Sequence, residues 1–176
     1  MKNMKSLIAS IAIVGVIGMA VGVVAQGATE ASVTSTVTVQ NISVTVANGT
    51  VAYGTLGVNT SKDTTLGGLN NTQVATNNGN VSETLNIKGQ PSASWTLGAA
   101  AGSDVYVHQF CKTGTGSPDP CDANPVYTAL TTSYQALATP VAAGGNQRFD
   151  LKITTPTVST SFVEQSVNVT VQAVAI

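Results

Sequence analysis

Residues 166–173 read Ser-Val-Asn-Val-Thr-Val-Gln-Ala, so that valine or alanine occupies every second position and a polar residue lies between. Strict alternation over eight positions is typical of a β-strand that buries one face. The β-branched side chains of this stretch also suit the pleated surface of a strand. We therefore predict a strand over residues 166–173, and the same pattern, followed along the chain, decides the fold class.

The alternation recurs many times after Gln26, and no segment there has a convincing helical period. It predicts strands over 33–39, 42–46, 81–87, 95–97, 105–110 and 148–153, while 126–130 and 134–137 are short enough to be strand or a helical turn. Parallel βαβ architecture needs crossover helices, so it is excluded. We predict an all-β fold, with a single antiparallel β-sandwich or jelly-roll-like domain over residues 26–176.

Three local features refine this prediction. The alternation changes phase at Gln40, which indicates a bulge or a bend between two strand segments. Asn48-Gly49 predicts a tight hairpin between residues 44–47 and 50–53, because both residues adopt positive φ angles readily. Glu83 shares a face with the apolar residues of the 81–87 strand, so it lies near a strand end or the register is wrong.

The first 25 residues have the order of a secretory signal. Lys2 and Lys5 precede a run from Leu7 to Val24 without a charged residue, and Val23-Val24-Ala25 is the best match to a cleavage site. The alternative is an uncleaved membrane anchor helix, since 18 residues are close to the minimum that spans a bilayer. In both cases the lysines stay inside and the chain after residue 30 is exported, so we expect a secreted or cell-surface protein.

Composition removes several classes of function. Only 9% of the residues are charged, 43% are hydrophobic and the net charge is −1. This apolar fraction is too high for plain disorder, and without a Lys/Arg cluster we expect no nucleic-acid partner. The chain has 25 Thr and 15 Ser but one His, which excludes most familiar active sites.

Cys111 and Cys121 flank a segment rich in Gly, Pro and Ser. In an exported chain such a pair predicts a structural disulfide, which stabilises a fold by roughly 2–3 kcal/mol for a loop this short. A redox or metal pair is the alternative, but nine intervening residues are unlike the short spacing of either.

We expect neither a catalytic residue nor a metal site, and therefore no enzyme. A Ser-His-Asp hydrolase would have to use His108, and the sequence has no Gly-x-Ser-x-Gly motif around a nucleophile. A zinc site with one His and both Cys in a disulfide is equally weak. Calcium is the remaining alternative, for which the candidate carboxylates are Asp104, Asp119, Asp122 and Asp150. Asp119 and Asp122 lie in the constrained disulfide segment, where clustered oxygens could hold the ion. Their spacing fits no EF-hand, and Asp beside Pro is common in turns.

The aromatic residues offer a candidate ligand site. Trp95, Tyr127 and Tyr134, together with Tyr106, could form a platform that stacks on a sugar ring. The alternative is that the core takes most of the eight aromatic residues, since a single Trp is more often found in the core of a sandwich.

Three stretches together resemble a known group of proteins. They are Asn77-Asn-Gly-Asn80 leading into a strand, Trp95-Thr-Leu97, and the C-terminal pair 150–156 and 167–173. This layout is similar to camelysin-like biofilm-fibre subunits and related archaeal pilus subunits. The resemblance implies polymerisation by donation of an N-terminal strand into the sheet of a neighbour. Here that part would fall to residues 31–39, with Val33, Val37 and Val39 on one face.

The leading hypothesis is therefore an exported structural protein that forms a filament, a coat or a matrix. Its partners would be copies of itself or other cell-surface proteins, and it would touch a membrane only through an uncleaved N-terminal segment. The alternative is an extracellular module that binds carbohydrate or another ligand, like an adhesin. Strand addition suits a hydroxyl-rich chain of low charge because main-chain hydrogen bonds supply the affinity.

Overall fold

The structure is a computed structural model that describes residues 30–113 and 120–176. The chain divides into two units, Met1–Thr38 and Val39–Ile176. The described residues of the first unit have no regular secondary structure. The described strands all belong to the second unit, which also carries the candidate functional residues discussed below except Val33 and Val37.

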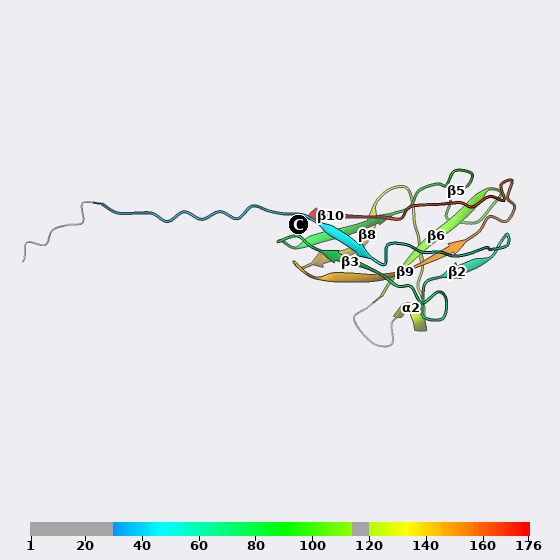
Figure 1. The fold of residues 1–176 in the computed structure, drawn as a ribbon, viewed down its shortest axis with the longest axis horizontal. Helices are drawn as coiled ribbons and strands as arrows, with labels where there is room; N and C mark the ends of the chain where they lie inside the picture. Colours follow the sequence, from blue (N-terminus) through cyan, green and yellow to red (C-terminus); the bar gives the residue numbers. More distant parts are fainter. Residues whose placement is uncertain (1–29, 114–119) are drawn as a thin grey trace, which may run out of the picture. The chain divides into compact units, whose positions relative to one another are not determined.

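The strands of Val39–Ile176 form two sheets (Figure 1). The larger sheet has the order β1-β3-β9-β6-β5, with β2 also paired to β9 and β7 to β6. The smaller sheet has the order β10-β4-β8. In chain order the elements are β1 (Val44–Ala47), β2 (Ser61–Asp63), β3 (Gln73–Asn77), β4 (Glu83–Lys88), β5 (Thr96–Leu97), β6 (Val105–Lys112), α2 (Pro120–Ala123), β7 (Thr128–Ala129), β8 (Gln135–Val141), β9 (Asn146–Thr154) and β10 (Thr170–Ala175).

One hydrophobic core joins the two sheets. Leu85 and Ile87 of β4 are fully buried in it, together with Phe149 and Leu151 of β9 in the other sheet. The alternating burial of β4 shows why its sequence alternates, since every second side chain faces the opposite sheet. In β9, Phe149, Leu151 and Ile153 are buried at every second position, and Asp150 between them is buried as well. The prediction of an almost entirely β-fold is confirmed, and the arrangement is sandwich-like.

Several predicted strands are present with shifted bounds. The regular pattern at 166–173 becomes strand only from Thr170, and 81–87 becomes β4. Glu83 is the first residue of β4 and is fully buried, so the predicted register is correct and the polar residue lies at the strand end. All strand pairs are antiparallel except β5 with β6, which is parallel.

The predicted hairpin at Asn48-Gly49 is wrong. Asn48 has a positive φ of 66°, but Gly49 is not among the residues with positive φ, so the turn differs from the two-residue type that closes a hairpin. Residues 50–53 form no strand, and β1 pairs instead with β3, which the polar sequence Gln-Val-Ala-Thr-Asn did not reveal.

The predicted signal or anchor over residues 1–25 lies outside the described residues. Within residues 30–113 and 120–176, no helix is long and apolar enough to cross a membrane. The predicted disulfide is present, and Cys111 of β6 is bonded to Cys121 of the short helix α2 with 6.0 Å between their Cα atoms.

Candidate functional site

The predicted assembly residues at the N-terminus are open to solvent. Val33, Val37 and Val39 are 91%, 90% and 80% exposed. Residues 30–38 form no strand, although their alternation predicts one. This segment alternates valine with hydroxyl residues, which is the sequence pattern of a strand, but it pairs with no sheet.

The smaller sheet has an outer edge of matching character in β10. This strand pairs with β4 over six consecutive residues without a register shift, and no backbone hydrogen bond joins its other edge to any described residue. Val171 and Ala173 pack against the core, while Gln172 and Val174 point outward. The strand has no proline and no charged residue, which are the usual means of protecting an edge from further pairing.

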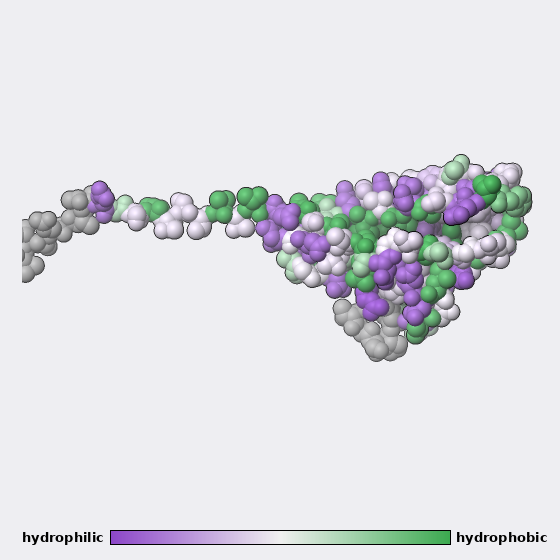
Figure 2. Space-filling model, in the orientation of Figure 1, coloured by the Kyte–Doolittle hydropathy of each residue, from purple (hydrophilic) through white to green (hydrophobic). Residues whose placement is uncertain are grey.

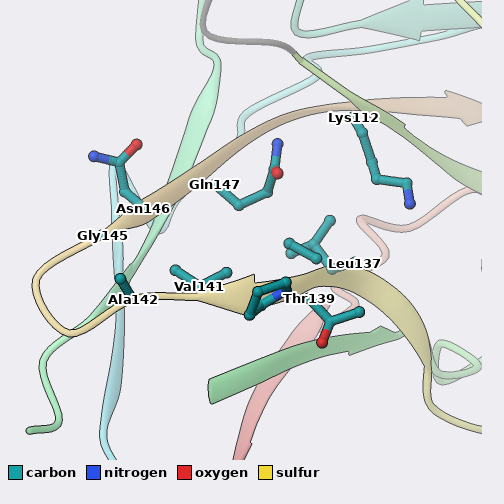
Figure 3. A pocket seen from close by; sticks show the side chains of 10 residues that line it. Lys112, Leu137, Thr139, Val141, Ala142, Gly145, Asn146 and Gln147 are labelled. Carbon is teal, nitrogen blue, oxygen red and sulfur yellow. The ribbon is translucent and has the colours of Figure 1, made fainter. Parts of the chain in front are cut away.

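The opposite edge of the same sheet, β8, is protected. It contains Pro140, which lacks an N–H, and its pairing with β4 has register shifts between Glu83 and Leu85 and between Leu85 and Asn86. Beside β8 lies an open depression of about 410 Å³. Figure 3 shows Leu137 and Val141 of β8 with Gln147 of β9 and Lys112 of β6 around it. None of the described residues that line this depression is aromatic or carries a carboxylate, so it offers little to a sugar or a cation.

The three aromatic residues predicted as a ligand site each have a different surrounding. Trp95 is half-buried, lies 6.3 Å from the ring of Tyr106 and donates its indole N–H to Ser159 Oγ at 2.9 Å. The ring of Tyr127 lies 5.3 Å from Lys152 Nζ, and that of Tyr134 lies 4.6 Å from Lys88 Nζ. No ring contact joins any two of the three among the described residues, so the structure does not bring them together as one platform.

Burial is the main influence on the pKa values of the Tyr127 and Tyr106 hydroxyls. It raises the pKa of the Tyr127 hydroxyl far above its usual range, and the nearby carboxylates of Asp63, Asp150 and Asp122 raise this pKa further. Burial also raises the pKa of Tyr106 to about 12. Both hydroxyls are therefore neutral at physiological pH, and Tyr106 donates to the Gln90 carbonyl at 2.5 Å.

His108 lies inside the core. It is 3% exposed, and its Nε2 atom lies 3.1 Å from the hydroxyl of Tyr53. Burial lowers the pKa of His108 to about 4, so the imidazole is neutral at pH 7. Its Nδ1 atom has no hydrogen-bond partner among the described residues, and no described serine or carboxylate bonds to the ring. These are the contacts of a core histidine.

The described carboxylates that were considered as calcium ligands each accept hydrogen bonds from donors of the protein. Both oxygens of Asp104 accept hydrogen bonds from Thr160, at 2.7 and 2.8 Å, and these bonds hold the pKa of Asp104 below its usual value. Asp122 accepts from the Leu66 N–H, and buried Asp150 accepts from Thr64 Oγ1. Asp119 lies outside the described residues. Within the described part of the chain no three His, Cys, Asp or Glu side chains gather where they could hold a metal ion.

Sequence reasoning missed a polar network at the turn between β3 and β4. Asn77 and Glu83 are fully buried there, and the side chain of Asn80 bonds to the backbone of Val39 and Asn41. The Asn-rich sequence 77–80 was the available signal, although it reveals only a turn and not which segment the turn contacts. This network holds the residues that link the two units in the sequence.

Hydrophilic residues do not dominate the face of Val39–Ile176 that Figure 2 presents. Figure 2 shows the face of Val39–Ile176 in view as mostly white and green, with purple residues scattered among them. No protein-family model, curated protein or solved structure matches the chain. The resemblance to camelysin-like fibre subunits therefore stays a prediction.

Proposed function

We propose that this chain is an exported structural protein of the cell surface whose copies join by strand addition. Residues 31–39 of one copy add to the free edge of β10 in the next copy and extend its three-stranded sheet. Repetition of this contact in one direction gives a filament or a matrix, because a head-to-tail contact between copies does not have to close on itself.

One observation carries the proposal. An uncharged segment with strand alternation that pairs with no strand occurs in the same chain as an uncharged edge strand, β10, whose second edge makes no backbone hydrogen bond to a described residue. The segment 31–39 contains nine residues, enough to pair along the six residues of β10. Added main-chain hydrogen bonds would satisfy both edges. Burial of a valine side chain contributes about 1.5 kcal/mol or more, and three exposed valines are available.

Export is the second part of the proposal. The charged start and long apolar run of residues 1–25 support it, as does the disulfide, since disulfides persist mainly in oxidising compartments. The two-layer arrangement fits a β-sandwich, which is common among surface proteins. Cell fractionation and thiol labelling test this part: we expect the protein outside the cytoplasm with both cysteines oxidised, and a reduced cytoplasmic protein would contradict it.

The assembly contact is tested with full-length chains, by light scattering and electron microscopy. The triple variant Val33→Ser, Val37→Ser, Val39→Ser removes the apolar face of the segment and should abolish fibres. The matched control Thr34→Ser, Thr36→Ser, Thr38→Ser changes the other face and should retain them. Monodisperse monomer of the unaltered chain at high concentration would overturn the proposal.

The acceptor edge is tested separately. Gln172→Lys with Val174→Lys places two charges on outward-facing positions of β10, where they oppose pairing of a further strand. We expect loss of fibres with little change in the stability of the monomer. Ala136→Lys, on the exposed side of the protected strand β8, is the control and should assemble normally. If the β8 variant failed and the β10 variant assembled, β8 would be the acceptor edge and the proposed contact with β10 would be wrong.

A further inference from the structure

The turn between β3 and β4 contacts the chain just before β1. β1 and β3 pair with Val44 opposite Asn77, and β3 ends there because the chain turns toward β4. Continuing the same antiparallel register would place Ser43 opposite Asn78 and Asn41 opposite Asn80. The backbone hydrogen bonds follow this continuation, since Asn78 N–H donates to Ser43 O at 2.8 Å and Asn80 N–H donates to Asn41 O at 3.1 Å.

In an ordinary ladder the opposing residues of such pairs exchange two bonds, and the return bonds would run to the carbonyls of Asn78 and Asn80. Here side chains provide them. Ser43 N–H donates to Glu83 Oε1 at 2.9 Å, and Asn41 N–H donates to Asn80 Oδ1 at 2.8 Å. Asn80 also donates from Nδ2 to the Val39 carbonyl at 2.8 Å. The side-chain amide of Asn80 therefore takes the place that a backbone peptide group would have if β3 continued beyond Asn77.

The turn has the geometry that these contacts require. Asn77 Oδ1 accepts from Gly79 N–H at 2.7 Å, and Asn77 Nδ2 donates to the carbonyls of Val81 and Val141 at 2.8 and 3.0 Å. A side chain at position 79 would collide with Asn41 O and Glu83 Oε1, so only glycine allows the close approach. The turn therefore positions its residues against one short segment, residues 39–43, and the residues that do so are Asn77, Gly79, Asn80 and Glu83.

The burial of Glu83 is costly, and its hydrogen bond explains why the residue is there. Its side chain is fully buried, and Oε2 has no hydrogen-bond partner among the described residues. A buried carboxyl with one satisfied oxygen is destabilising compared with an apolar side chain of similar size. The satisfied oxygen bonds to the Ser43 backbone, which indicates that order in residues 39–43 is the property that Glu83 provides.

We propose that the turn Asn77–Glu83 is a clamp that keeps residues 39–43 in strand register with β3, with Asn80 and Glu83 as its positioning residues. The role of the clamp in assembly rests on the proposed function: it fixes the point of attachment of the donor segment, so that fewer residues lose conformational freedom when a second copy binds. Because every bond to residues 39–43 described above goes to the backbone, the clamp holds them regardless of their side chains.

The clamp itself is tested by amide hydrogen exchange of Asn41 and Ser43 in the full chain, kept monomeric by Gln172→Lys and Val174→Lys. Asn80→Ala should speed exchange at Asn41 by about five- to tenfold, the effect of one lost hydrogen bond. Glu83→Met should do the same at Ser43, whereas Glu83→Gln retains an acceptor oxygen and should preserve protection. Gly79→Ala should release both amides. Unchanged protection in these variants, or no protection before substitution, would overturn the clamp.

The positioning role is tested by assembly of the same single variants without the β10 substitutions. Freeing two or three residues costs entropy on binding, so we expect roughly tenfold weaker assembly for Asn80→Ala and Glu83→Met, and recovery for Glu83→Gln. Asn124→Ala, at an exposed position outside the turn, should match the unaltered chain. Loss of protection with unchanged assembly would overturn the positioning role. If the unaltered chain never assembled, the proposed function would fail while the exchange measurement still decided on the clamp.

Discussion

Two buried ionisable side chains lie at opposite ends of the core and are used in different ways. Glu83 pairs with Val141, just before the chain turns into β9, whereas His108 pairs with Ile153 close to the end of β9. Glu83 accepts a hydrogen bond from a backbone N–H of the segment before β1. His108 contacts the hydroxyl of Tyr53, a side chain.

This difference in hydrogen-bond partner indicates which property each buried side chain controls. A buried side chain that bonds to backbone fixes the course of a chain segment, and its removal releases that segment. A buried side chain that bonds to another side chain joins two elements within the core, and its removal affects core packing and stability. We therefore expect substitutions at the Glu83 end to change the local order of residues 39–43 and assembly as well as stability. Substitutions at the His108 end should change stability and its dependence on pH, but not the order of residues 39–43.

The largest loss of stability is expected for Asn77→Ala at the Glu83 end. This fully buried side chain makes three hydrogen bonds to backbone groups, and its removal leaves these groups unpaired. We expect the free energy of unfolding to fall by about 3–5 kcal/mol. Denaturant unfolding measures it, with Asn78→Ala as control, because Asn78 is exposed and its side chain bonds only to Thr45 Oγ1. Equal losses for both variants would contradict the assignment.

The next effect concerns pH and belongs to His108. Its pKa is about 4 in the folded state against an ordinary value of 6.5, so the unfolded chain binds more protons between these values. The stability contributed by the neutral imidazole is complete above pH 6.5 and is lost as the pH falls toward 4. The loss amounts to about 3 kcal/mol. Unfolding curves of the unaltered chain and of His108→Gln at about pH 7, 5.5 and 4.5 isolate it, since the variant lacks this titration. Parallel pH profiles would show that His108 is accessible to protons in the folded state.

The sequence predicts the elements of this fold better than their pairing. Strands such as β4 and β9 are visible because apolar residues occur at every second position. β3 is hidden because the ends of its buried face are Gln73 and Asn77, which form hydrogen bonds instead of apolar contacts. The hairpin predicted at Asn48-Gly49 fails because β1 finds its partner far along the chain, and such a choice depends on the whole sheet.

The candidate functional residues show the same difference between what the sequence predicts and what depends on strand pairing. The candidate assembly residues Val33, Val37 and Val39 could be identified from alternation alone, although residues 30–38 form no strand. The clamp could not, because it depends on the register of β1 with β3 and on where β3 ends. Once that register is known, the sequence Asn-Asn-Gly-Asn becomes informative, since each residue occupies a position at which backbone pairing would otherwise stop.

The smallest expected effect tests whether the two ends are independent. Tyr53→Phe removes the hydroxyl that contacts His108 Nε2 and should lower the free energy of unfolding by about 1–2 kcal/mol, because a buried nitrogen is left unpaired. Tyr134→Phe is the matched control, since Tyr134 is 41% exposed, and its stability should be nearly unchanged. Amide exchange at Asn41 and Ser43 should be the same in both variants as in the unaltered chain. Faster exchange at Ser43 in Tyr53→Phe alone would mean that the core couples the two ends, and that residues 39–43 depend on packing at His108 as well as on Asn80 and Glu83.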